Sequence, residues 1–359
     1  ALAQASSTAV AASLVLGQVD MLRGTAAARF DTNDKFAYPW ALAMDSENIL
    51  YVADSFNRIL AFRTPFQAAE RIIGIGTTNN VPLSPPTATS FALPQGLAAS
   101  GDSLLVADTG NNRVLRYPLF AQWPSGTTLP EPTAVIGQPN FTQGNAGTSA
   151  TALASPMHIF ATPTDIYVAD TLNNRIAVFP AGGAVASRVI GQTSPDYGGV
   201  NLADANTVFT AALVARTAGN AIMGGGVTFD TRSSPPRMYV ADTFNNRVLG
   251  FCDARRAGEV TLILGQPNAG QTRANYNPDG STARSDSNLY WPMGVAVDAS
   301  GNLFVSDFGN SRVLRFPDPC ADPTAEHHAD LVLGQSSFTT RETTASASHM
   351  SGPYGLAFM

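Results

Sequence analysis

The hydrophobic positions of the chain form short alternating runs that recur at intervals of 54 to 72 residues. One run reads Leu-Tyr-Val-Ala-Asp or a close variant, so aliphatic and aromatic residues end at an aspartate. Each copy is followed by an Asn-Arg or Asn-x-Arg step and then by a second apolar run. This pattern predicts one β-hairpin per copy. Five copies occur, at residues 50–54, 104–108, 166–170, 238–242 and 303–307.

The polar residues between the two runs fit the chemistry of a tight turn. The aspartate can accept hydrogen bonds from turn amides, and asparagine tolerates the left-handed backbone that such a turn demands. The arginine begins the next strand, where it can pair with the aspartate and cover apolar surface between units. Because the set recurs in every hairpin, we interpret it as structural. Its members are Asp54, Arg58, Asp108, Asn112, Arg113, Asp170, Asn174, Arg175, Asp242, Asn246, Arg247, Asp307, Asn310 and Arg312.

Two further elements flank each hairpin. A run that starts with proline in five of six copies, three of them as Pro-x-Gly, precedes the hairpin and predicts a first, innermost strand. A run that ends at a glycine, usually followed by glutamine, predicts a fourth, outer strand. Four strands per unit in a radial array are typical of β-propellers. The predicted first strands start near residues 39, 94, 156, 224, 292 and 353, and the predicted fourth strands end near residues 17, 74, 137, 191, 265 and 334.

The hairpin core Val-Ala-Asp-x-x-Asn-Asn-Arg-Val, as in residues 106–114, resembles the NHL repeat. The continuation Gly137 to Phe141 is similar to that of secreted bacterial NHL proteins. The resemblance covers residues 13–359 and implies a six-bladed propeller of four-stranded blades, with residues 1–12 as an N-terminal extension. RNA binding occurs in some NHL domains, and this resemblance therefore raises it as a candidate activity.

The strand count predicts five complete units and a partial sixth. The extra fourth strand near residue 14 and the extra first strand near residue 353 would make half a blade without its hairpin. We favour a chain that continues beyond Met359, and the alternative is a blade completed by another segment. A strand donated by a neighbouring copy would make the protein a subunit of an extracellular assembly.

The composition of the chain argues against some functional classes, nucleic-acid binding among them. The net charge is -6, only 13% of residues are charged, and Lys35 is the single lysine. This balance disfavours nucleic acid, including RNA, as a partner, because phosphate contacts require a basic surface. No apolar stretch is long enough to span a membrane as a helix. The opening residues 1–5 resemble the small-residue region around a signal-peptidase site, and a cloning boundary is the alternative interpretation. We expect an extracellular or cell-surface location.

The two cysteines, Cys252 and Cys320, follow the third strands of neighbouring units. They lack the spacing of a metal site. Two separate thiols are the favoured interpretation, and a bridge between adjacent blades is the alternative.

Ligand-contacting residues are expected where long loops meet the first strands. Connections from a fourth strand to the next first strand are long, and loops on a rigid scaffold often bind ligands. Their rings could anchor a ligand or simply pack the loops onto the blades. The loop rings are Phe30, Phe36, Tyr38, Phe141, Tyr197, Tyr276, Tyr290 and Phe338, and the candidates near the starts of first strands are Trp40, His158, Trp291 and Tyr354.

The residue types at the predicted inner strands give little support for a catalytic site. Metal-dependent propeller lyases and hydrolases hold a metal on inner strands, but the inner strands here are apolar and the chain has four histidines. We predict no catalytic residues and no resident metal. Two fragments, residues 31–34 and 277–286, contain calcium-like oxygen ligands without the EF-hand pattern.

We therefore expect a non-catalytic, secreted or cell-surface interaction module that binds a protein or a glycan through its long loops. The alternatives are the structural subunit described above and a metal-dependent propeller lyase or hydrolase.

Overall fold

The computed structural model describes residues 10–18, 20–22, 33–74, 81–126, 129–199, 224–256 and 260–358. The chain divides into two compact units, which we treat separately. The N-terminal unit comprises Thr25–Val200 with Leu16–Gln18 and Met359, and the C-terminal unit comprises Asn201–Phe358 with Ala1–Val15 and Val19–Gly24.

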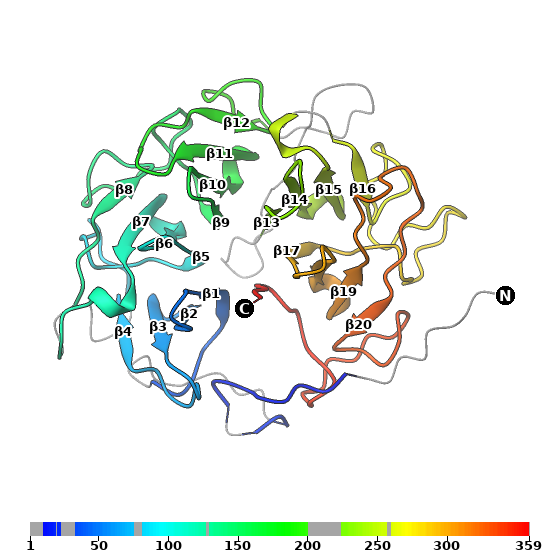
Figure 1. Ribbon diagram of the computed structural model, residues 1–359, viewed down its shortest axis with the longest axis horizontal. Coiled ribbons are helices and arrows are strands. Elements are labelled where there is room, and N and C mark those ends of the chain that lie inside the picture. Colours follow the sequence, from blue (N-terminus) through cyan, green and yellow to red (C-terminus); the bar gives the residue numbers. More distant parts are fainter. Residues whose placement is uncertain are drawn as a thin grey trace. The chain divides into compact units, whose positions relative to one another are not determined.

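The N-terminal unit contains three antiparallel four-stranded sheets, which we call blades 1 to 3. In each blade the strands are ordered as in the sequence, from the first strand to the fourth (Figure 1). Blade 1 consists of β1 (Pro39–Met44), β2 (Leu50–Asp54), β3 (Arg58–Phe62) and β4 (Arg71–Ile73). Blade 2 consists of β5 (Pro94–Ser100), β6 (Ser103–Asp108), β7 (Arg113–Pro118) and β8 (Ala134–Ile136). Blade 3 consists of β9 (Pro156–Ala161), β10 (Asp165–Asp170), β11 (Arg175–Pro180) and β12 (Arg188–Ile190).

The C-terminal unit contains two sheets of the same kind, blades 4 and 5. Blade 4 consists of β13 (Val227–Asp230), β14 (Arg237–Asp242), β15 (Arg247–Phe251) and β16 (Leu262–Leu264). Blade 5 consists of β17 (Pro292–Val297), β18 (Leu303–Asp307), β19 (Arg312–Phe316) and β20 (Leu331–Leu333).

Single-turn 3-10 helices complete the regular structure. Four of them form the hairpin turns between the second and third strands of blades 2 to 5: η1 (Thr109–Asn111), η3 (Thr171–Asn173), η4 (Thr243–Asn245) and η6 (Phe308–Asn310). The other two, η2 (Phe120–Gln122) and η5 (Ala254–Arg256), follow third strands. After each hairpin helix, the next residue adopts a positive φ of 50° to 58°, as Asn112 and Ser311 illustrate.

The hydrophobic core lies between neighbouring blades within each unit. Side chains such as Tyr51 and Ile59 of blade 1 pack with Val106 and Tyr117 of blade 2. A corresponding cluster fills the space between blades 2 and 3, and another joins blades 4 and 5. Each sheet therefore buries its face against the sheet of the neighbouring blade. The first strands β1, β5 and β9 lie side by side (Figure 1).

The predicted partial sixth blade is wrong, because the described residues form five four-stranded blades and neither leftover segment forms a strand. Residues 14–18 contain only an isolated bridge between Gly17 and Lys35, and residues 353–358 have no strand pairing. In a blade, the first strand pairs with the second and the fourth pairs with the third. A first and a fourth strand without the hairpin have no ladder partner, so neither becomes a strand. The hypothesis of an assembly formed by strand donation depended on this half-blade, and it is therefore left without its structural basis.

The prediction of two separate thiols is also wrong. Cys252 and Cys320 form a disulfide with a Cα–Cα distance of 5.4 Å. Residue 252 follows β15 and residue 320 follows β19, so the bond joins blades 4 and 5 at their third strands. Sequence spacing alone could not reveal this, because it depends on how closely the two blades pack.

Candidate functional site

One end of every blade gathers the hairpin turn and the long loops, and we call it the loop face. The first strand begins there, the second ends there, the third begins there and the fourth ends there, because the strands are antiparallel. Each loop that connects two blades therefore passes over the same end as the Asp-Arg turn. This placement decides what the repeated polar residues can contact.

The repeated aspartate and arginine form an ion pair in every blade. In blades 2 to 5 the arginine Nε donates to the aspartate Oδ2 at 2.7 Å, and in blade 1 the Nη2 of Arg58 donates to Asp54 at the same distance. The side chains of these pairs are 0–4% exposed. A buried pair contributes little net stability, but it is costly to break, because the remaining charge is left without a partner.

The guanidinium groups also bind the backbone of the loops. Arg175 donates to the carbonyl oxygens of Ser149 and Ala152 at 2.9 Å, in the loop that precedes blade 3, and to that of Pro195 in the loop that follows it. Arg113 and Arg312 likewise bind the loops on both sides of their blades. Each of these arginines therefore fastens two successive loops to one blade.

In blades 2 to 5, the aspartate and the first asparagine of the turn complete the attachment. Asp170 Oδ1 accepts a hydrogen bond from the backbone N–H of Ala154 at 2.7 Å, just before β9, and its Oδ2 accepts one from Asn173 at 2.8 Å. The equivalent backbone bonds reach Asp108 and Asp307. The predicted acceptor role of the aspartate thus extends mainly to the loop before the blade, and less to the hairpin turn itself.

Burial has a clear electrostatic effect on these carboxyls. It raises the pKa of Asp108, and the adjacent Arg113 guanidinium offsets part of that rise. The same balance applies to Asp170 and Asp307, each beside its own arginine.

Two sets of residues in this network were missed by the sequence analysis. The first is the set of asparagines that bind the aspartates: Asn111, Asn173 and Asn245. The second is the glutamine that follows the fourth strand in blades 2 to 5. Gln138 donates from Nε2 to the carbonyl oxygens of Asn112 and Asn145, and Gln335 makes the corresponding bonds to residues 311 and 342. The recurrence of Gly-Gln at the ends of fourth strands is the sequence signal for this glutamine, because a strand end alone requires no glutamine.

The second asparagine of the turn joins one blade to the next loop. Asn112 donates from Nδ2 to the carbonyl oxygen of Gly144 at 2.8 Å, and its Oδ1 accepts the N–H of Ser155 at 2.8 Å. Asn246 makes the same two kinds of bond, to Thr272 and Trp291. The long loops are thus held by several side chains each.

The four candidate ligand residues lie in different environments. Trp40 is half-buried on β1, and His158 is on β9, paired across the ladder with Ala169. Trp291 precedes β17 with a φ of 52°, and its ring centroid is 4.6 Å from that of Tyr290. Tyr354 is 7% exposed. Burial lowers the pKa of His158 to about 4, and its Nδ1 is buried without a hydrogen-bond partner.

The loop rings divide into packed and exposed groups. Phe36 is buried in the core of blade 1, which matches the packing interpretation. Tyr38 and Tyr197 are 65% and 53% exposed. Phe30, residues 31–32 of the first calcium-like fragment and most of the loop after β12 lie outside the described residues.

The loop face of blade 3 carries an exposed apolar pair. Leu172 in η3 is 42% exposed, and Tyr197 lies in the loop after β12. Their neighbours are bonded, since Asn174 donates to the carbonyl oxygen of Gly198 at 3.3 Å. Exposed apolar side chains on a fixed surface are typical of interaction sites. We call Leu172 and Tyr197 the blade 3 patch.

Within the part of the chain that the structure describes, no three His, Cys, Asp or Glu side chains are grouped as a metal site would require. The described helices are also too short or too polar to cross a membrane.

Repeated antiparallel four-stranded sheets with a common loop face define a repeat protein of β-propeller blades. Residues 91–117 and 289–316 match the family model described as NHL repeat. A stretch of 86 residues, 23% of this chain, is 37% identical to the human (Homo sapiens) NHL repeat-containing protein 2, and covers 12% of that protein. The chain carries NHL repeats, and it matches only a small part of this curated relative's length.

Two solved structures are similar to this chain at low sequence identity. A chain of a nidogen/laminin complex is 15% identical, with 81% of this chain and 80% of that chain covered and a TM-score of 0.46. A virginiamycin B lyase from Staphylococcus aureus is also 15% identical, with 89% and 88% covered and a TM-score of 0.46. At this level, neither likeness carries an argument about function.

Proposed function

We propose that this protein is a non-catalytic interaction module that binds a protein partner through the loop face. The observation that carries the proposal is the network of buried arginines that fastens the long loops to the blades. Loops held in one conformation lose little entropy on binding, so their exposed side chains form a ready contact surface. The blade 3 patch supplies apolar anchors of the kind that interfaces use.

We also propose that the protein works outside the cytosol, in an extracellular or cell-surface setting. The disulfide between Cys252 and Cys320 supports this location, because disulfides persist in oxidising compartments. Detection of the intact disulfide by thiol alkylation and mass spectrometry of protein from its native source would test it. Free thiols in native material would overturn the proposal.

Mutation of the blade 3 patch tests the binding surface. We expect the Leu172→Ser/Tyr197→Ser variant to lose capture of the native partner from extracellular material, while it remains folded by circular dichroism. The matched control is Val185→Ser. Val185 is 56% exposed and lies between β11 and β12, at the opposite end of the same blade.

Equal capture by both variants would exclude the loop face of blade 3 as the binding surface. A turnover assay with lactone and polyuronate substrates addresses the non-catalytic part. Saturable turnover that persists through purification to homogeneity would contradict the proposal.

A further inference from the structure

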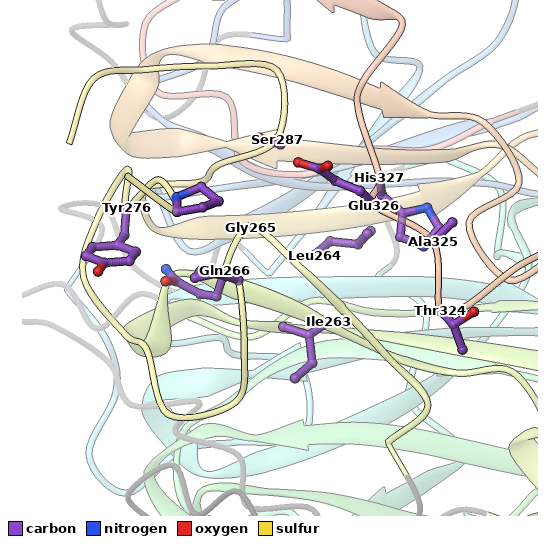
Figure 2. Close-up of a pocket in the computed structure, with 12 residues that line it drawn as sticks. Ile263, Leu264, Gly265, Gln266, Tyr276, Ser287, Thr324, Ala325, Glu326 and His327 are labelled. Atoms are coloured by element: carbon purple, nitrogen blue, oxygen red, sulfur yellow. The ribbon is translucent and has the colours of Figure 1, made fainter. Parts of the chain in front are cut away.

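The C-terminal unit contains a pocket of about 360 Å³ beside the fourth strand of blade 4, and none of the paired aspartates or arginines is among its lining residues. Three segments line it: the end of β16 with Gly265 to Pro267, the loop between blades 4 and 5, and the loop that precedes β20. Figure 2 shows Tyr276 and Gln266 on one side of the pocket and Glu326 with Thr324 on the other. Its volume falls within the range of about 300–1,000 Å³ that is usual for small-molecule sites.

The walls of the pocket are held together by specific bonds. The backbone N–H of Ala329 donates to the carbonyl oxygen of Asp286 at 2.9 Å, and His328 Nδ1 lies 3.0 Å from the Asp286 carboxylate. The disulfide at Cys320 fastens the start of the same loop to blade 4. The pocket is therefore preformed between two blades.

The polar groups of the lining are mainly hydrogen-bond acceptors. The Glu326 carboxylate is 74% exposed. Gln266 is 7% exposed and uses its Nε2 for two backbone carbonyls, while its Oε1 has no partner. The equivalent Gln335 differs, because its Oε1 accepts the backbone N–H of Glu342 at 2.7 Å. His327 Nε2 is also buried without a partner, and burial lowers the pKa of this histidine, so its ring is neutral at pH 7.

The apolar part of the lining consists of the aromatic ring of Tyr276, the pyrrolidine rings of Pro267 and Pro278, and the side chains of Ile263, Leu264 and Ala325. An aromatic ring beside hydrogen-bond acceptors suits a molecule with one C–H face and several hydroxyl donors. Ser287 and Thr324 add hydroxyls that can donate or accept.

The charges around the pocket disfavour anionic ligands. Glu326 repels anions, and no lysine or arginine is among the lining residues. The guanidinium of Arg273, which is not a lining residue, lies 5.8 Å from the Tyr276 ring centroid, and the test therefore includes a cationic probe. We propose that this pocket binds a neutral saccharide unit, stacked on the rings and bonded through its hydroxyls to Glu326 and Gln266. This site is separate from the blade 3 patch, so its failure would leave the protein-binding proposal intact.

The test is titration of the whole chain with neutral methyl glycosides of glucose, galactose and mannose and with N-acetylglucosamine, followed by NMR and calorimetry. We expect saturable binding of at least one of them. Glu326→Ala should weaken it by about tenfold, the loss expected for one hydrogen bond to a charged group. Tyr276→Ala should weaken it similarly by removing the stacking surface. The matched controls, Glu131→Ala and Tyr38→Ala, should leave the affinity unchanged.

Three outcomes would overturn the proposal. The first is that none of the four neutral sugars binds. The second is that binding survives both pocket variants while circular dichroism shows that they are folded. The third is that glucuronate or N-acetyl-lysine amide, the anionic and cationic probes, binds more tightly than every neutral sugar.

Discussion

Replacing Arg175 by methionine removes one ion pair and three loop contacts in a single change. The Asp170 carboxylate would lose its positively charged partner in a site where both side chains are fully buried. The carbonyl oxygens of Ser149, Ala152 and Pro195 would lose their guanidinium donors. Methionine keeps much of the apolar stem, so lost packing contributes little.

The magnitude follows from these losses. An uncompensated buried charge costs about 3–5 kcal/mol, and each buried carbonyl without a donor costs about 1–3 kcal/mol. The loops can move toward water and recover part of the second cost. We therefore expect Arg175→Met to lower the free energy of unfolding by about 4–6 kcal/mol.

Urea unfolding measures the loss, and hydrogen exchange locates it. Amides near residues 149–154 and 192–198 should exchange faster in Arg175→Met, because both loops are released. The matched control is Arg315→Met, since Arg315 pairs with Asp330 at the surface, where side-chain exposures are 32% and 44%. That change should cost less than about 1 kcal/mol.

The reasoning would be refuted if the two arginine variants lost equal stability. It would also be refuted if exchange increased only in β11 and not in the two loops. If Arg175→Met does not fold, Asp170→Asn keeps the arginine and one of the two acceptor oxygens, and exchange in the same loops can then be compared.

Three further predictions concern other features. His158 stays neutral in the folded protein, whereas the unfolded chain binds the proton at a higher pH. The free energy of unfolding should therefore fall by up to about 3 kcal/mol as the pH drops from about 6.5 to about 4. A pH series of urea melts should show this slope, and His158→Gln should flatten it. Reduction of Cys252–Cys320, 68 residues apart, should cost about 4 kcal/mol, and a reductant without effect on the melt would contradict this. Gly137→Ala should lower the free energy of unfolding by about 2–4 kcal/mol, because φ is 85° and a Cβ would clash with Leu153. Gly101 has a φ of 58° but faces open space, so Gly101→Ala should cost only about 1 kcal/mol. Equal losses in thermal melts would show that the clash with Leu153 contributes nothing.

Local sequence pattern predicted the hairpins well, because their signals lie within a few residues. The run ending at Asp108 and the run starting at Arg113 became β6 and β7, with Asp108 opposite Arg113. The same reasoning failed for residues 14–18 and 353–358. Their apolar patterns match those of real strands, but pairing depends on a neighbouring strand, and no local pattern reports whether that strand exists.

The loop contacts were hidden for a related reason. Gln138 and Arg113 bind backbone carbonyl oxygens, which every residue carries, so the loop sequences give no sign of the partner. The saccharide pocket likewise depends on Gln266 and Glu326, which are 60 residues apart and come together only through the packing of two blades.

The arginine contacts have a consequence for how such a protein could be altered. Arg113 and Arg175 recognise main-chain oxygens, so most side chains of the loops could be replaced without disturbing their anchorage. A library randomised at outward-facing loop positions, with each Asp, Arg and Gln retained, would keep its scaffold while sampling new specificities. Natural descendants of this gene could diverge along the same route, changing what they recognise faster than they change their architecture.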